Sequence, residues 1–218
     1  MSNLYVSDLD GTLLRSNEAT SEYTNQVINS LVDKGMIFSY ATARSLITAK
    51  KVTKGIHAKI PVIVYNGAFV IDNITEKILI ANYFDDSVHS VLEDIFSNGV
   101  YPIVYAYING KEKFSFVREM CTRGMEMFLE SRKGDIRTNE VKALPELKEG
   151  NIFYITCIDA PEKLKPLYDN YKEYLSEQIP VVTGFCLKVV IAVLLFFIGR
   201  RIIKWLMKVM LLQMHMRN

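Results

Sequence analysis

Two aspartates separated by one residue follow an apolar run near the N-terminus, in the sequence LYVSDLDGTLL. In an extended strand, residues i and i+2 point to the same side, so Asp8 and Asp10 are expected to share one face. Two carboxylates held this close repel each other unless a proton or a cation lies between them. The spacing therefore predicts that a proton or a cation lies between these carboxylates.

The segments that must position this pair alternate between strand and helix patterns. Apolar runs predict buried strands, and apolar residues at helical spacing between Ser21 and Gly35 predict a helix with a cap at each end. Alternation at this spacing is typical of parallel βαβ units. The expected elements are a strand over 4–7, a helix over 20–34, a strand over 36–41, a helix over 44–54 and a strand from 61.

Polar residues follow each of the three predicted strands. Asp8 and Asp10 end the first strand, and Thr42 and Arg44 follow the second. The pair Asn66-Gly67 follows the third strand. In parallel sheets functional groups gather at the carboxyl ends of the strands, so these residues are expected to meet at one edge.

The pattern changes after Asn66-Gly67, which is a strong hairpin turn pair. The segments AFVI and KILIAN predict antiparallel pairing, and YPIVYAY and KFSFV predict a second hairpin around 108–110. Amphipathic helices are expected over 85–97 and 161–176, and a strand over 151–158. Residues 82–178 are therefore expected to form a second α/β unit, inserted after the third parallel strand.

The segments DLDGTLL, YATAR and YNGAFV, in this order, resemble the haloacid dehalogenase (HAD) superfamily, and within it the Cof-like phosphatases with a large α/β cap. The resemblance covers residues 3–178. It implies an α/β fold with a Rossmann-like parallel core over 1–81 and an inserted cap over 82–178. The core is expected to be incomplete, and a C-terminal hydrophobic helix is expected over 179–218.

The resemblance also implies a mechanism. Asp8 is expected to be the nucleophile that forms an aspartyl-phosphate, and Asp10 the general acid and then the base. Both would hold Mg²⁺, which prefers oxygen ligands. The implied substrate is a small phosphorylated metabolite, a phosphate monoester, and no nucleic acid is expected. The expected phosphate- and substrate-binding residues are Leu9, Gly11, Thr12, Thr42, Arg44, Asn66 and Gly67.

Other interpretations of these residues stay open at this point. Asp8 and Asp10 also fit simple strand-end caps, and Thr42 fits an ordinary helix N-cap. Asn66-Gly67 also fits a turn without further function. Four aromatic residues fit either the lining of the cap over the active site or, preferably, the core of the cap. They are Tyr101, Tyr105, Tyr107 and Phe114.

Two parts that the family needs after the cap are not found in this sequence. One is a lysine in a Ser-Lys-Gly context, and the other is an acidic pair in a Gly-Asp-x-x-Asn-Asp context. The nearest match, KGDIRTNE over 133–140, follows a helical stretch inside the cap and does not fit. We therefore expect phosphate recognition with impaired turnover, and a first strand that lies at a free sheet edge.

Composition and charge favour a folded cytoplasmic protein with an unusual tail. The formal net charge is +2, and from Lys188 onward there are six Lys or Arg and no Asp or Glu. Three cysteines without a CxxC pair fit a reducing compartment. The N-terminus lacks the pattern of a signal peptide. The charge asymmetry points to a membrane or another anionic surface for the tail alone.

The tail predicts a membrane-seeking helix. Residues 189–198 are all apolar, and 181–199 has about the length needed to cross a bilayer. Basic residues beyond Gly199 form one helical stripe, as in interfacial helices. The stretch weakly resembles the first membrane helix of small-conductance mechanosensitive channels. Contact with a membrane through 181–215 is expected, and a core helix is the alternative.

The junction near 176–184 fits a real fusion, a frameshift or an assembly artefact. The alternative function is a membrane-anchored or channel-derived fusion protein with a vestigial hydrolase domain.

Overall fold

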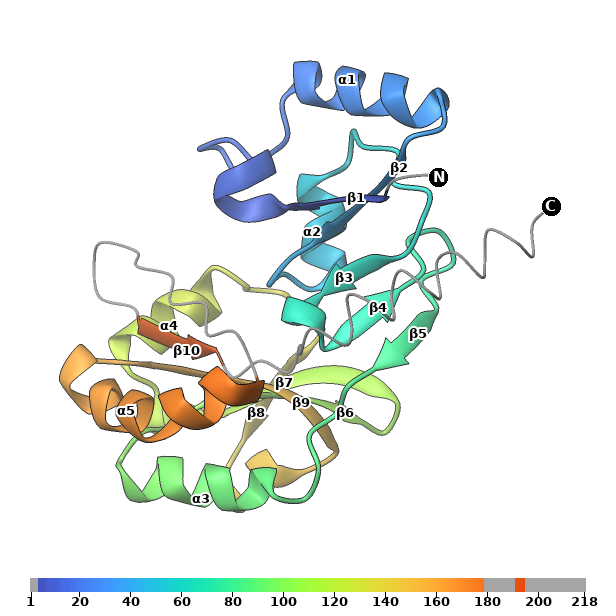
Figure 1. Cartoon of the computed structure of the whole chain (residues 1–218). Helices are drawn as coiled ribbons and strands as arrows, with labels where there is room; N and C mark the ends of the chain where they lie inside the picture. The colour runs from blue at the N-terminus through green and yellow to red at the C-terminus, as the bar shows by residue number, and fades with distance from the viewer. Residues whose placement is uncertain (1–3, 179–190, 195–218) are drawn as a thin grey trace. The chain divides into compact units, whose positions relative to one another are not determined.

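The computed structural model describes residues 4–178 and 191–194. This part of the chain divides into two compact units with the boundary between Asn82 and Tyr83. The first unit comprises residues 4–82, drawn from blue to cyan-green in Figure 1, and the second comprises residues 83–178 with 191–194. The expected α/β fold with parallel strands is confirmed, and each unit has its own sheet.

The first unit is a five-stranded sheet in the order β1-β2-β3-β4-β5. The first three strands are parallel, whereas β4 and β5 run antiparallel to their neighbours. Asp8 pairs with Ala41, and Ala41 with Ile63, so the three parallel strands end near one edge. The elements are β1 (Leu4–Asp8), α1 (Glu22–Asp33), β2 (Ile37–Ala41), α2 (Leu46–Val52), β3 (Val62–Val64), β4 (Phe69–Ile71) and β5 (Ile78–Ala81).

Both helices of the first unit begin at a serine whose hydroxyl accepts a backbone N–H. Ser21 Oγ accepts from Thr24 N at 3.1 Å, and Ser45 Oγ accepts from Thr48 N at 3.2 Å. These bonds satisfy amides that a helix start leaves unpaired. Since Ser45 caps α2, the alternative interpretation of Thr42 as the N-cap of this helix is wrong.

Strand β1 lies at one edge of its sheet, as expected from the sequence. Its side chains are poorly covered: Tyr5 is 52% exposed and Val6 is 47% exposed. In α1 only Ile28 is buried, while Val27 and Leu31 are exposed although they belong to the same predicted apolar pattern. The strand that carries the first aspartate therefore has one sheet neighbour among the described residues.

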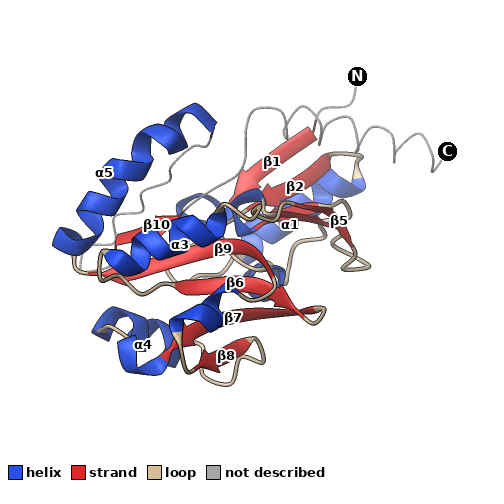
Figure 2. Cartoon of the chain, turned by 90° about the horizontal axis from the view of Figure 1, so that it is seen from below, coloured by secondary structure: helices blue, strands red, loops and turns tan. Residues whose placement is uncertain are grey.

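The second unit has a sheet in the order β10-β9-β6-β7-β8, whose strands lie side by side in Figure 2. All neighbours are antiparallel except β7 and β8, which are parallel. The elements are α3 (Val88–Ser97), β6 (Ile103–Ile108), β7 (Lys111–Val117), α4 (Arg123–Glu130), β8 (Thr138–Val141), β9 (Asn151–Asp159), α5 (Pro161–Gln178) and β10 (Ile191–Leu194).

Both faces of this sheet are packed. Leu92 of α3 and Leu164 of α5 are fully buried in one core cluster with Val104 of β6. The adjacent residue, Tyr105, contacts Phe114 with ring centroids 5.7 Å apart. Successive strand residues point to opposite faces, so these aromatic rings belong to the other face, which α4 covers (Figure 1).

Two of the four aromatic residues lie in the core. Tyr105 is 7% exposed and Phe114 is fully buried, as the preferred interpretation expects. The predicted hairpin around 108–110 is also present, because β6 and β7 pair through a turn at Asn109 and Gly110 with φ of 50° and 74°. Left-handed backbone at both turn positions is the reason for the Asn-Gly pair.

The predicted C-terminal helix is wrong for the four residues of it that the structure describes. Ile191–Leu194 forms β10, antiparallel to β9. A short apolar run with β-branched residues fits a strand as well as a helix, and periodicity alone cannot separate the two. The remaining residues of the predicted membrane-seeking segment lie outside the described part of the chain. Within 4–178 and 191–194, no helix is long and apolar enough to cross a membrane.

Candidate active site

The loop after β1 turns sharply and presents both aspartates. The Leu9 side chain is fully buried and anchors the loop, and Leu14 N donates to Leu9 O at 2.9 Å. Gly11 has φ of +75°, a left-handed backbone that favours glycine. The carboxylate of Asp8 accepts a hydrogen bond from Leu9 N at 2.7 Å. This bond is the one expected if Asp8 caps the end of the strand.

The residues after β2 are fixed by backbone bonds to the next strand. Thr42 is 3% exposed, and its N–H donates to Ile63 O at 3.0 Å. Its hydroxyl oxygen accepts from Arg44 N at 3.1 Å. The hydroxyl hydrogen of Thr42 has no acceptor among the described residues, so it can be donated to an oxyanion.

The turn between β3 and β4 is hydrogen-bonded to the loop after β2. Asn66 N donates to Thr42 O at 2.8 Å, and Tyr65 N donates to Arg44 O at 3.0 Å. Tyr65, Asn66 and Gly67 all have positive φ, at 50°, 56° and 97°. Left-handed backbone at a tyrosine is costly and is retained only where its surroundings demand it. This turn therefore acts as a rigid support for the second strand end.

Arg44 joins the loops through its guanidinium group. Its Nε donates to both carboxylate oxygens of Asp10 at 3.2 and 2.9 Å, and its Nη2 donates to Asp10 Oδ1 at 2.6 Å. A further bond runs from Nη2 to Glu18 at 3.2 Å. The hydrogen bond to Asp10 is the largest cause of the raised pKa of Arg44. A planar fork on a carboxylate fixes orientation as well as charge.

Sequence reasoning missed Glu18. It lies in the loop after Asp10 with φ of 56°, and its side chain is 73% exposed. Its partner Arg44 is 26 residues further along the chain. Neither a motif nor a periodic spacing links these positions, so only the folded loop reveals the contact.

The structure brings most of the predicted site residues together. Asp10, Thr42, Arg44 and Asn66 are connected by the hydrogen bonds above, and Asp8 lies level with the end of β2. Thr12 is exposed and makes no hydrogen bond to the other strand ends. Leu9 and Gly67 are buried, and the Leu9 amide is bonded to the Asp8 carboxylate.

The oxygen donors at this edge fit part of a Mg²⁺ shell. Among the described residues, no group of three or more His, Cys, Asp or Glu side chains is arranged to hold a metal ion. The loop offers the Asp8 carboxylate and the main-chain carbonyl of Asp10. Mg²⁺ is often held by one or two carboxylates together with water and substrate phosphate oxygens. The pair fits that mode of binding, and it does not fit a site in which the protein supplies most of the ligands.

Comparison with known proteins places these observations in one family. The sequence profile of the family described as haloacid dehalogenase-like hydrolase matches residues 5–191. This match covers the strand ends described above and the second unit as far as residue 191.

Several curated relatives carry the name "putative phosphatase", and three of them are described here. A protein of Buchnera aphidicola subsp. Schizaphis graminum is 32% identical over 88 residues, 40% of this chain and 32% of its own length. One from Buchnera aphidicola subsp. Baizongia pistaciae is 41% identical over 69 residues, 32% and 26% of the two lengths. One from Mycoplasma genitalium is 30% identical over 115 residues, 53% and 41% of the two lengths. The matched regions span less than half of these relatives.

Solved structures show the same fold. TM0651 from Thermotoga maritima superposes with a TM-score of 0.70 at 22% identity, covering 96% of this chain and 76% of that one. BT4131, a sugar phosphatase of HAD subclass IIB, superposes with a TM-score of 0.62 at 14% identity, covering 89% and 70%. At these identities the likeness concerns the fold alone.

Proposed function

Because the chain belongs to the haloacid dehalogenase-like hydrolase family, we propose that its first unit binds phosphate monoesters of small metabolites and transfers the phosphoryl group to Asp8. One observation carries the proposal. The ends of β1, β2 and β3 are linked by hydrogen bonds, and they gather two carboxylates, a buried hydroxyl and a guanidinium at one edge. These are the groups that a transferring phosphoryl group requires.

In the proposed first step, an Asp8 carboxylate oxygen forms a bond to phosphorus while the bond to the ester oxygen breaks. Asp10 gives its proton to the leaving oxygen, which departs as an alcohol. In the second step Asp10 takes a proton from water, whose oxygen attacks phosphorus and releases Asp8 and inorganic phosphate. Asp10 must be protonated for the first step, so at least one carboxylate oxygen of Asp10 has to be released from its hydrogen bond to Arg44.

Binding is assigned to the surrounding residues. We assign the Thr42 hydroxyl to donate to a phosphoryl oxygen, and the amides of the loop at Gly11 and Thr12 to bind the same group. Arg44 orients Asp10 through its fork and attracts the substrate anion. Asp8 and the Asp10 carbonyl would hold Mg²⁺, which would offset negative charge between the carboxylate and the phosphate.

We further propose that turnover by this chain is slow. The sequence carries neither the lysine nor the acidic pair that the resemblance calls for. Without the lysine, the groups that we assign to offset the charge of Asp8 and the phosphate are the metal ion and Arg44. Binding of the phosphoryl group is then expected to survive better than its transfer.

The test uses orthovanadate as a phosphate analogue and para-nitrophenyl phosphate as a substrate, both with the full chain. We expect Mg²⁺-dependent vanadate binding, which Thr42→Val weakens about tenfold through loss of one hydrogen bond to an anion. Thr75→Val, on an exposed turn, is the matched control. Failure to bind vanadate would contradict the proposed site, whereas fast hydrolysis abolished by Asp8→Asn would contradict the proposed impairment alone.

The cytoplasmic location and the membrane contact through 181–215 remain predictions from the sequence. Fractionation of cells that produce the full chain tests the membrane contact. Recovery in membranes that resist a high-salt wash would support it, and recovery in the soluble fraction without detergent would contradict it.

A further inference from the structure

Arg44 divides its hydrogen-bond donors between two carboxylates, and Glu18 is the second of them. Nε and Nη2 of Arg44 both donate to Asp10, and Nη2 also donates to Glu18 Oε2 at 3.2 Å. A guanidinium offers five N–H donors in a fixed plane, and each terminal nitrogen supplies two of them. Nη1 of Arg44 forms no hydrogen bond within residues 4–178 and 191–194. Only this nitrogen is therefore left to receive a ligand oxygen.

The turn that carries Glu18 is held by its own backbone. Arg15 N donates to Ala19 O at 2.9 Å, and Glu18 N donates to Arg15 O at 2.9 Å. Glu18 has φ of 56°, a left-handed backbone that residues other than glycine seldom adopt. The side chain of Arg15 is exposed and forms no ion pair with a described residue. The turn therefore presents the Glu18 carboxylate to Arg44, 26 positions further along the chain.

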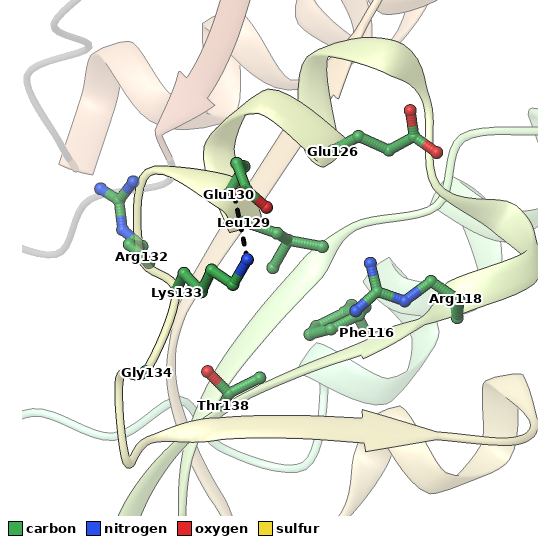
Figure 3. A pocket seen from close by; sticks show the side chains of 9 residues that line it. All are labelled: Phe116, Arg118, Glu126, Leu129, Glu130, Arg132, Lys133, Gly134 and Thr138. Atoms are coloured by element: carbon green, nitrogen blue, oxygen red, sulfur yellow. Dashed lines mark ion pairs between the residues drawn. The ribbon is translucent and has the colours of Figure 1, made fainter.

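This contact differs from an ordinary exposed ion pair. Figure 3 shows such a pair in the second unit, where Lys133 and Glu130 line a pocket beside α4, 3.6 Å apart and three positions apart in the sequence. Both of these side chains are more than 70% exposed. Glu18 is similarly exposed, at 73%, but its partner Arg44 is 21% exposed and is also bonded to Asp10. The pair therefore places the charge of Glu18 next to Asp10.

The three side chains together carry no excess positive charge. With Asp10 ionised, one guanidinium faces two carboxylates and the group is negative. With Asp10 protonated, as the proposed first step requires, the group is neutral. A second anion on a substrate therefore finds no unmatched cation in this group, whereas a cation on the substrate is attracted or tolerated.

The leaving group of a bound ester lies on the same side as Glu18. In the proposed function Asp10 gives its proton to the ester oxygen, so this oxygen comes within hydrogen-bond reach of Asp10. Arg44 is bonded to Asp10, and Glu18 is bonded to Arg44. The charge of Glu18 therefore acts on the alcohol part of the ester, and Nη1 of Arg44 is still available to one phosphoryl oxygen.

We propose that Glu18 is a specificity-determining residue. It favours phosphate monoesters of uncharged or cationic alcohols over those whose alcohol carries a carboxylate or a second phosphate. It repels the second anion and occupies the Nη2 donor that this anion would otherwise use. A repulsive element of this kind gives specificity by weakening the binding of the wrong ligand. The inference rests on the proposed function, because it needs Asp10 beside the leaving group.

The test measures the binding of three short phosphate monoesters to the full chain by calorimetry in the presence of Mg²⁺. Phosphoglycolate ends in a carboxylate, 2-hydroxyethyl phosphate in a hydroxyl, and phosphoethanolamine in an ammonium group. We expect phosphoglycolate to bind about tenfold more weakly than 2-hydroxyethyl phosphate. Phosphoethanolamine should bind at least as tightly as 2-hydroxyethyl phosphate.

Glu18→Gln keeps the size of the side chain and removes its charge. It should strengthen the binding of phosphoglycolate about fivefold and weaken that of phosphoethanolamine by a similar factor. Opposite effects on two probes are not expected from a general loss of stability. Both effects should shrink as the salt concentration rises, because exposed charges are screened. Glu18→Asp retains the charge and should leave the order of the three affinities unchanged.

Glu76 provides the matched control in the same unit. It also has a positive φ, at 60°, and its side chain is 61% exposed and pairs with Lys50 at 2.6 Å. It lies in the turn after β4, which runs antiparallel to β3 and so leads away from the strand ends. Glu76→Gln should therefore change each affinity by less than about twofold, because the charge lies beyond the screening distance.

Two results would overturn the inference. One is an unchanged ratio of the phosphoglycolate and phosphoethanolamine affinities in Glu18→Gln, and the other is an equal change of this ratio in Glu76→Gln. If orthovanadate still binds in either case, the inference fails alone and the proposed phosphate site stands. If neither orthovanadate nor any of the three esters binds the unsubstituted chain, the proposed function fails together with the inference.

Discussion

Each unit contains an arginine that holds two carboxylates, and the two clusters differ in burial. In the second unit, Arg137 is bonded to Asp135 at 2.6 Å and to Glu112 at 2.7 Å, and the three side chains are 6%, 17% and 20% exposed. In the first unit, Arg44 is bonded to Asp10 and Glu18, and the exposures are 21%, 50% and 73%. The chemical groups are the same, so the surroundings decide what each cluster does.

Burial makes the cluster around Arg137 structural. Removing one partner from a buried charged group leaves the others uncompensated, whereas an exposed pair contributes little to the free energy of unfolding. The residues around Arg137 cannot change partners at low cost. Asp10 can exchange Arg44 for a proton or for a water molecule at low cost. The exposed cluster at the strand ends is therefore the one suited to chemistry.

The largest expected loss of stability comes from a substitution that breaks the buried cluster. Arg137→Ala should lower the free energy of unfolding of the second unit by about 3–5 kcal/mol, because Asp135 and Glu112 lose their shared cation. Arg44→Ala is the matched variant in the first unit and should cost less than about 1 kcal/mol. Hydrogen exchange read peptide by peptide measures each unit separately. Equal costs for the two variants would show that burial does not separate the clusters.

A pH series sharpens the same comparison. The side-chain hydrogen bond from Arg137 is the main cause of the lowered pKa of Asp135, whose ordinary value is 3.8. A carboxyl group with a depressed pKa stabilises the fold above its unfolded pKa, and this contribution is lost as the pH falls through the folded pKa. Asp135→Asn should therefore cost about 2–4 kcal/mol at pH 7.

The cost of Asp135→Asn should shrink progressively as the pH falls below about 4, the unfolded value. Urea unfolding of both proteins at pH 7, 5, 4 and 3 measures the difference. A cost that stays constant down to pH 3 would mean that the ionised form of Asp135 is not what the fold requires. Asp33→Asn, in an exposed ion pair at 3.3 Å, is the control.

A substitution at Arg44 tests whether the exposed cluster takes part in binding or hydrolysis. Arg44→Lys keeps the charge but loses the planar fork that holds both oxygens of Asp10. We expect vanadate binding or residual hydrolysis to fall about tenfold, which corresponds to about 1.4 kcal/mol, with little change in stability. An unchanged activity profile would remove Arg44 from the positioning of Asp10. A large loss of stability would make the cluster structural.

Local pattern predicted much of the fold, and the exceptions have physical reasons. The strands and helices before Gly67 have strong periodicity and clear caps, so β1 to β3 follow from the sequence. Strand β8 does not, because TNEV is mostly polar and pairs at a sheet edge. Asp135, three residues before this strand, is bonded to Arg137.

The candidate site was predictable where a strand end alone defines it. Asp8, Asp10 and Thr42 follow apolar runs, and the sheet brings runs of this kind to one edge. The bond between Arg44 and Asp10 spans 34 positions, and only the loop conformation determines it. Glu18 was missed for the same reason. Sequence motifs identify the residues at strand ends, but they do not predict contacts between loops.

The smallest expected change in the free energy of unfolding comes from a pair of valine substitutions, one in each sheet. Val6 lies in edge strand β1 and is 47% exposed, whereas Val104 lies in central strand β6 and is 1% exposed. Val6→Thr should change the free energy of unfolding by less than about 0.5 kcal/mol. Val104→Thr should cost about 1–3 kcal/mol, because it buries a hydroxyl among apolar neighbours. Hydrogen exchange of each unit measures both. If Val6→Thr proved as costly as Val104→Thr, β1 would be covered in solution, and the strand that carries Asp8 would have a second neighbour.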